Sequence, residues 1–268
     1  MQKFMAVMAF VLVLAAKAAL AEAPATVFLE QLTWTELKDE IGAGKTTILV
    51  PIGGVEQSGP DMALGKHDVR VKALSEKIAL QLGNALVAPV IAYVPEGSVN
   101  PPTAHMRLPG TITVPDQTFE TVLEYAARSF KLAGFRDIVF LGDHGGYQRD
   151  EQVVADRLNG EWKKSQTRVH ALPEYYRTTL GEYVLALERQ GYSAAEIGTH
   201  AGLADTSLML AVDPALVRTD RLASDVRLTA AEGVYGDPRR SSAALGQLGV
   251  DLIVARTVAA IRKAEARR

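Results

Sequence analysis

The sequence contains no cysteine and carries almost no net charge. Its 268 residues include no Cys, and 29 basic side chains are balanced by 31 acidic ones, for a formal net charge of -2. The absence of cysteine excludes disulfides, thiolate metal sites and a cysteine nucleophile. Because no region is strongly basic, electrostatics gives no basis for binding nucleic acid.

The motifs of several large enzyme classes are also absent. There is no G-x-S-x-G turn, so Ser58 and Ser207 are poor candidates for a nucleophile. The chain has no phosphate-binding loop of the G-x-x-x-x-G-K-S/T type, and the glycines after the first apolar run lack G-x-G-x-x-G spacing. The H-E-x-x-H zinc motif is missing as well.

The N-terminus has the pattern of an export signal. Lys3 provides a positive charge, residues 5–16 are almost entirely apolar, and residues 19–21 (Ala-Leu-Ala) have the small residues of a cleavage site. The pattern predicts a signal peptide at residues 1–21 and a periplasmic or secreted protein. An uncleaved anchor is the alternative, although the apolar run is shorter than the roughly 20 residues that span a bilayer. Residues 22–268 are predicted to form a single α/β domain.

Segments with strand and helix patterns alternate along the rest of the chain. Apolar runs without polar alternation are typical of strands that helices cover on both faces. We expect strands at residues 47–52, 85–93, 137–141 and 168–172. We expect helices at residues 32–41, 68–82, 116–133, 148–163, 178–190, 206–212 and 243–266, the last of them broken at Gly249. This alternation predicts an α/β fold with a mostly parallel central sheet.

Histidines and carboxylates gather where the predicted strands end. Glu56 and His67 follow the first strand, and His144 follows the third. Two histidines and one carboxylate bind Zn²⁺ in several hydrolases and leave a position open for water, whose pKa then falls to about 7. His105 lies in a proline-rich loop at residues 95–115, and long ordered loops of this kind are usually functional.

Four blocks of the sequence resemble blocks of the creatininase family. Residues 49–60 (LVPIGGVEQSGP) are similar to the family's P-x-G-x-x-E-Q-H-G block, and residues 105–112 (HMRLPGTI) are similar to its H-x-x-F-P-G-T block. Residues 142–148 (GDHGGYQ) resemble N-G-H-G-G-N, and residues 200–209 (HAGLADTSLM) resemble H-A-G-E-x-E-T-S. The order and the spacing of the four blocks also agree with the family.

The resemblance implies a three-layer α/β/α sandwich and a site for divalent metal, often two ions of Zn or Mn. It also implies hydrolysis of a cyclic amide or another C–N bond. Members of the family are commonly hexamers, so a homo-oligomer is expected. Matched by position, Glu56 and His144 correspond to metal ligands, and His200 corresponds to a histidine placed for proton transfer.

Four positions depart from the family pattern, one of them Leu203, which stands where the final block has an extra acidic residue. Ser58 stands in place of a His ligand, His67 in place of the bridging Asp, and Asp205 in place of the Glu of the final block. A neutral imidazole offers one lone pair and cannot bridge two cations. We therefore predict a single divalent ion, Zn with Mn or Fe as alternatives, and the ligands Glu56, His67, His144 and Asp205. In a competing alignment, Asp68 takes the bridging role instead of His67.

The remaining predicted roles concern catalysis and substrate binding. His200 and Asp205 are predicted to transfer protons. The predicted substrate-binding residues are His105, Gly145, Gly146 and Tyr147, with the two glycine amides facing an oxyanion.

Three neighbours of these residues have open or supporting roles. Tyr175 and Tyr176 either close the pocket or pack in the core. Asp143 is expected to support His144 by a hydrogen bond rather than to bind the metal itself.

The function predicted from the sequence is an exported, metal-dependent amidohydrolase that cleaves the C–N bond of a small-molecule amide or cyclic amide with metal-activated water. Within this class, the altered ligand set argues against creatinine and leaves a formamide or a peptide-like C–N bond as the alternative substrate. The alternative function is that of a non-catalytic small-molecule-binding protein with the same fold, because fold alone does not determine function. The presence of both His200 and Asp205 favours the enzyme, since a binding protein has no need of a positioned acid and base. We expect no binding to nucleic acid, and no membrane-spanning segment once the signal peptide has been removed.

Overall fold

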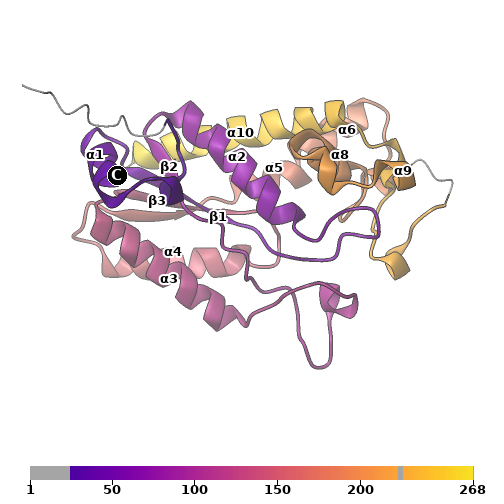
Figure 1. The fold of residues 1–268 in the computed structure, drawn as a ribbon, viewed down its shortest axis with the longest axis horizontal. Coiled ribbons are helices and arrows are strands. Elements are labelled where there is room, and N and C mark those ends of the chain that lie inside the picture. The colour runs from indigo at the N-terminus through magenta and orange to yellow at the C-terminus, as the bar shows by residue number, and fades with distance from the viewer. Residues whose placement is uncertain (1–24, 223–225, 268) are drawn as a thin grey trace, which may run out of the picture.

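Figure 1 shows a computed structural model of the chain, which describes residues 25–222 and 226–267. The signal peptide predicted at residues 1–21 lies outside the described residues. Within them, helices cover both faces of one central sheet. This arrangement confirms the predicted α/β/α sandwich.

The central sheet has four parallel strands in the order β2-β1-β3-β4. They are β1 (Thr47–Ile52), β2 (Ala85–Val87), β3 (Asp137–Gly142) and β4 (Arg168–Ala171). β2 is much shorter than the strand predicted at residues 85–93. Pro89 has no N–H to donate to a strand ladder, so regular pairing ends before it. The chain returns to the sheet only for an isolated bridge between Ile91 and Ile52.

Helices form the two outer layers. One layer contains α2 (Lys66–Leu82), α5 (Glu174–Leu180), α6 (Glu182–Arg189), α8 (Leu203–Val212) and α10 (Ala243–Glu265). The other contains α1 (Trp34–Gly42), α3 (Asp116–Ala133) and α4 (Gln148–Glu161). The shorter elements are α7 (Ala194–Ile197), α9 (Thr219–Leu222) and the 3-10 turns η1 (Leu29–Gln31), η2 (Ala104–Arg107), η3 (Pro214–Leu216), η4 (Ala230–Glu232) and η5 (Pro238–Arg240).

Side chains of the central strands alternate between the two helical layers, and both faces of the sheet are buried. Leu49 and Val139 pack into the core on the α2 and α10 side. Ile48 and Phe140 pack into the core on the α3 and α4 side. Figure 1 shows these two layers on opposite sides of the strands. Burial of both sheet faces under helices therefore explains why the strand segments show no alternation of polar and apolar residues.

Two helical segments that contain glycines have other boundaries than predicted. The segment predicted as one helix at residues 178–190 is divided into α5 and α6 at Gly181. α10, in contrast, continues through Gly249. A Cβ at Gly249 would lie 2.8 Å from a methyl carbon of Leu208, and one at Gly246 would lie 1.8 Å from the carbonyl oxygen of Ser207. These glycines therefore allow α10 to pack closely on α8.

α10 is also the one helix in the described part of the chain with the length and hydropathy of a membrane span. Half of its apolar stretch is buried inside the protein. The helix packs against α2, α5 and α8, which is the setting of a core helix.

The carboxyl ends of β1 and β3 meet at one edge of the sheet, where an open α/β fold places its ligands. The loop of residues 53–65 leaves β1, and the turn of residues 143–147 leaves β3. A long loop at residues 88–115 runs beside them, carries η2 and extends beyond the sheet (Figure 1). The backbone N–H of Ile112 in this loop donates to the carbonyl oxygen of Val55, which holds the loop against the end of β1.

Candidate metal centre

Glu56 lies at the centre of the site, fully buried in the loop after β1. Its two carboxylate oxygens have different surroundings. Oε1 accepts a hydrogen bond from Nε2 of His67 at 2.5 Å and lies 3.3 Å from Nζ of Lys66. Oε2 is buried and accepts no hydrogen bond from an N–H group of the described residues. It lies 3.4 Å from Nε2 of His105 and 3.7 Å from Nε2 of His144.

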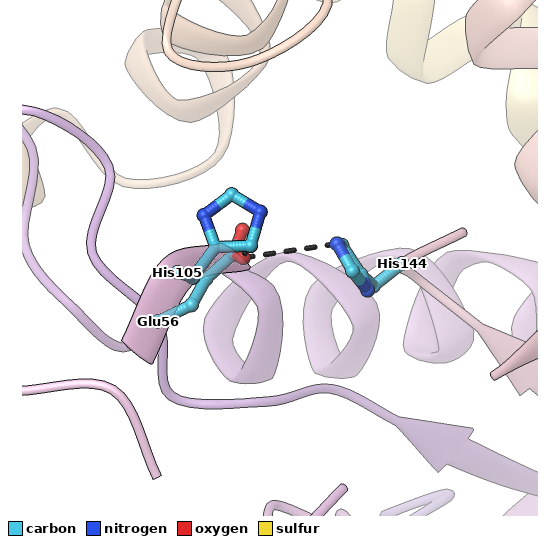
Figure 2. A group of neighbouring side chains, drawn as sticks. All are labelled: Glu56, His105 and His144. Carbon is cyan, nitrogen blue, oxygen red and sulfur yellow. Dashed lines mark ion pairs between the residues drawn. The ribbon is translucent and has the colours of Figure 1, made fainter. Parts of the chain in front are cut away.

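Glu56, His105 and His144 have the composition of a metal site. One oxygen of Glu56 and one nitrogen of each histidine lie within 4.8 Å of one another. Figure 2 shows both rings beside the carboxylate. Burial lowers the pKa of His144 to about 4 and also lowers the pKa of His105, so both imidazoles are neutral at pH 7. A neutral imidazole is the form that binds metal, and two such ligands with one carboxylate leave a position open for water, so the residues fit a divalent ion.

Different elements bring the two histidines to Glu56. His105 belongs to η2 in the long loop, and its Nδ1 lies 3.1 Å from Nε2 of Gln57. His144 follows β3, where its backbone N–H donates to the hydroxyl of Tyr147 at 3.1 Å. That hydroxyl is fully buried and donates in turn to the carbonyl oxygen of Gly53 at 2.6 Å. It therefore ties the ends of β1 and β3 together beneath the site.

His67 lies between two carboxylates, those of Glu56 and Asp143. Its Nε2–H donates to Glu56 and its Nδ1–H to Asp143, each across 2.5 Å. Burial acts to lower the pKa of His67, but the two carboxylates outweigh burial and raise it. Both ring nitrogens of His67 are thus engaged by carboxylates in this structure, and its role as a metal ligand stays a prediction. Asp68, the alternative ligand, accepts a hydrogen bond from the backbone of Gly54 at 2.8 Å instead.

Asp205 is held by two cations of α2. Lys66 contacts its Oδ2, and Nη1 of Arg70 lies 2.5 Å from its Oδ1. The backbone N–H of Ala201 also donates to Oδ2 at 3.1 Å. Burial acts to raise the pKa of Asp205, but Lys66 and Arg70 outweigh it and hold this pKa well below its usual range. Both oxygens are engaged, so this geometry does not suit the predicted roles of metal ligand and base.

His200 is fixed at one ring nitrogen and open at the other. Its Nε2–H donates to the carbonyl oxygen of Gln57 at 2.9 Å, so the lone pair of the neutral ring is on Nδ1. Nδ1 lies 3.6 Å from Oε1 of Glu56. Burial, and then the charge of Lys66, lower the pKa of His200 to about 3, which keeps the ring neutral. The proton-transfer role of His200 stays a prediction.

The family model of creatininase, described as creatinine amidohydrolase, matches residues 30–261. This chain belongs to the creatininase family. Creatinine amidohydrolase of Pseudomonas putida is 24% identical to it over 259 residues, which cover 89% of this chain and 97% of the relative. The mycofactocin precursor peptide peptidase of Mycolicibacterium smegmatis is 26% identical over 221 residues, which cover 75% of this chain and 78% of the relative.

Solved creatininase structures share the fold. A crystal structure of creatinine amidohydrolase superposes with a TM-score of 0.75 at 23% identity, covering 89% of this chain and 98% of that one. A creatininase variant of the Zn-Zn type has a TM-score of 0.73 at 25% identity, with the same coverage. A manganese form of creatininase has also been solved. The comparisons confirm the predicted family and its class of metal-dependent hydrolases, and the metal forms support a divalent ion in this chain.

Only one of the four predicted substrate-binding residues lines the cavity beside the creatininase-like site. This cavity has a volume of about 750 Å³, and His105 forms part of its wall. Gly145 is exposed, but it is not part of the cavity wall. The backbone N–H of Gly146 donates to Nδ1 of His144 at 3.1 Å rather than facing an oxyanion. Tyr147 is buried beneath the site.

The sequence left open whether Tyr175 and Tyr176 close the pocket or pack in the core, and the structure places one in each setting. Tyr176 lines the cavity, whereas Tyr175 is buried and donates its hydroxyl to Oδ1 of Asp143 at 2.8 Å. Asp143 also accepts a hydrogen bond from Nε of Arg70 at 2.9 Å. The expectation that Asp143 supports His144 is wrong, because its oxygens are taken up by other partners.

Sequence reasoning missed three charged residues of this site. Lys66 and Arg70 are almost fully buried, and their spacing of four, which places both on one face of α2, was the available signal. Glu96 comes from the long loop and is also buried, with Oε2 3.7 Å from Nδ1 of His144. Neither of its oxygens accepts a hydrogen bond from the described residues. Burial, and then the negative charge of Glu56, raise the pKa of Glu96 to about 8.

Proposed function

We propose that this chain is an amidohydrolase that cleaves the C–N bond of a small amide or cyclic amide with one divalent metal ion. Glu56, His105 and His144 are the proposed ligands. The observation that carries the proposal is the buried Oε2 of Glu56, which faces two neutral imidazoles beside a cavity and has the protonated carboxyl of Glu96 as its hydrogen-bonding neighbour. A buried carboxylate is costly unless it is paired, and a divalent ion beside Oε2 would pair it.

The proposed set differs from the one predicted from the sequence. His105 replaces His67, because His67 donates from both ring nitrogens to carboxylates. Asp205 is excluded because Lys66 and Arg70 engage its oxygens. When bound, the ion lowers the pKa of a water to about 7 and polarises the substrate carbonyl. We propose Zn as the native ion, with Mn as the alternative.

His200 is the residue we assign to proton transfer. Gln57 holds the proton on Nε2, so the lone pair on Nδ1 is directed toward Oε1 of Glu56. Nδ1 has no hydrogen bond among the described residues, and we propose that it takes a proton from the attacking water and returns it to the leaving nitrogen. General acid and base steps of this kind contribute roughly 10²- to 10⁴-fold in rate.

Metal-dependent hydrolysis is tested by removing and restoring the ion. The protein is treated with a chelator, reloaded with Zn²⁺ or Mn²⁺, and assayed for amine or ammonia release from small linear and cyclic amides, creatinine included. We expect activity only with metal, and none in His144→Ala. His170→Ala is the matched control, because His170 on β4 pairs with Asp137 on β3 and does not line the cavity. Full activity in the metal-free protein would overturn the proposal.

We also propose that the protein is exported and that it is a homo-oligomer. The export proposal is supported by the charged start and apolar run at residues 1–21. The oligomer proposal rests on the family resemblance. Deletion of residues 2–21 should leave the protein in the cytoplasmic fraction of expressing cells, whereas the full chain should be found outside it. A full chain that stays cytoplasmic would contradict export.

A further inference from the structure

Lys66 is a buried cation placed between two carboxylates of the site. It stands at the first position of α2, and only 1% of its surface is exposed. Its Nζ lies 3.3 Å from Oε1 of Glu56 and contacts Oδ2 of Asp205. A buried charge persists only when it is paired, so this ammonium and its two partners hold one another in place.

The pairing divides the Glu56 carboxylate into two functional halves. Oε1 is engaged by Lys66 and by His67, whereas Oε2 is left for His105 and His144. A second divalent ion that used Oε1 would have to displace both donors. It would leave Lys66 with Asp205 as its one remaining carboxylate partner, so a second ion would work against this buried pairing.

No other permanent cation among the described residues is placed in the same way. Arg70 reaches the far side of Asp205, where Nη1 contacts Oδ1, and its Nε donates to Asp143. It has no ion pair with Glu56. Lys66 alone touches both Glu56 and Asp205.

We propose that Lys66 is a built-in cation that takes the place of a second divalent ion between Glu56 and Asp205. This inference rests on the proposed metal centre and adds a positioning residue to it. Lys66 keeps Oε1 of Glu56 occupied, so Oε2 faces the two histidines and the chain binds one ion. Two of the departures from the creatininase pattern, Ser58 and His67, agree with a site that has no second metal.

The test counts bound metal in Lys66→Met, in Lys66→Arg and in the wild-type chain. Each protein is titrated with Mn²⁺, and bound metal is measured by elemental analysis and by electron paramagnetic resonance, which detects coupling between neighbouring Mn²⁺ ions. We expect one uncoupled ion in the wild type and in Lys66→Arg. In Lys66→Met the carboxylate oxygens that Lys66 engaged on Glu56 and Asp205 should take up a second ion in place of the ammonium, with a coupled signal. The same variant should unfold at lower temperature without metal and recover with it.

Lys72→Met is the matched control, because Lys72 lies on the same helix but pairs at the surface with Glu30. It should bind one ion, like the wild type. Two ions in the wild type, or a folded Lys66→Met with one ion and unchanged affinity, would overturn the role of Lys66 while leaving the hydrolase proposal standing. A wild type that binds no ion would overturn both. Failure of Lys66→Met to fold even with metal would also contradict the role of Lys66, because a second ion should restore the stability of this variant.

Discussion

His67 donates to Glu56 across 2.5 Å, and this hydrogen bond occupies the oxygen that would otherwise be available to a metal. The other ring nitrogen of His67 donates to Asp143 across the same distance. His67 therefore belongs to the charge network beneath the site, together with Lys66 and Arg70. The following predictions separate that network from the metal ligands.

Replacement of His67 should affect stability more than metal content. His67→Gln removes a donor shared by two buried carboxylates, and breaking a buried charge pair costs about 3–5 kcal/mol. We expect a loss of this size in urea unfolding, with one metal ion still bound to the folded variant. His170→Gln, which removes a half-buried partner of Asp137, should cost less. Loss of the metal with unchanged stability would show that His67 is a ligand.

Glu96 should make the metal-free protein less stable as the pH rises. Its pKa is about 8 in the fold, against an ordinary value of 4.5, so between these values the folded state binds more protons than the unfolded state. Stability contributed by the neutral carboxyl is therefore lost as pH rises from about 4.5 to 8, with a slope of up to about 1.4 kcal/mol per pH unit.

Glu96→Gln removes this titration while keeping the shape of the side chain. Relative to the wild type, the variant should gain stability between pH 5.5 and pH 8 in urea unfolding with chelator present. A constant difference between the two proteins across this range would contradict the buried neutral state of Glu96.

Tyr147→Phe should destabilise the fold and loosen His144. The hydroxyl donates to the carbonyl oxygen of Gly53 and accepts from the backbone N–H of His144, and all three groups are buried or half-buried. Leaving such groups unpaired costs about 1–3 kcal/mol, measured by thermal unfolding. Tyr125→Phe, at an exposed position of α3, is the control and should have almost no effect. Equal effects of the two substitutions would contradict the proposed tie between β1 and β3.

Metal should protect the long loop against proteolysis, because His105 lies in that loop while its two partners lie at the strand ends. Arg107, an exposed residue two positions after His105, is a trypsin site. We expect cleavage there to be at least several-fold slower with Zn²⁺ than with chelator, and the difference to disappear in His105→Ala. Protection that persists in His105→Ala would show that the loop is not held through this residue.

The strand and helix pattern made the fold predictable because both faces of β1 and β3 are buried, which leaves long apolar runs in the sequence. Thr33 and Glu36 form a capping box at the start of α1, and this is a local pattern that a sequence displays directly. β2 was predicted too long because its apolar run continues past Pro89, and composition does not show where pairing stops.

The metal centre was only half predictable. Glu56 and His144 follow buried strands, so their convergence follows from parallel topology. His105 lies on a loop whose path no local pattern determines, and it was assigned to the substrate. Lys66 and Arg70 have the spacing of an exposed helix face, so their burial depends on Asp143 and Asp205 from distant segments.

The most direct test of the account is anomalous X-ray diffraction at the zinc edge from crystals of the Zn-loaded protein. We predict one zinc peak per chain, from an ion bound by Oε2 of Glu56 and by nitrogens of His105 and His144, with Nζ of Lys66 still between Glu56 and Asp205. Two zinc peaks in each chain, or a single zinc ion bound by His67 and Asp205, would contradict it.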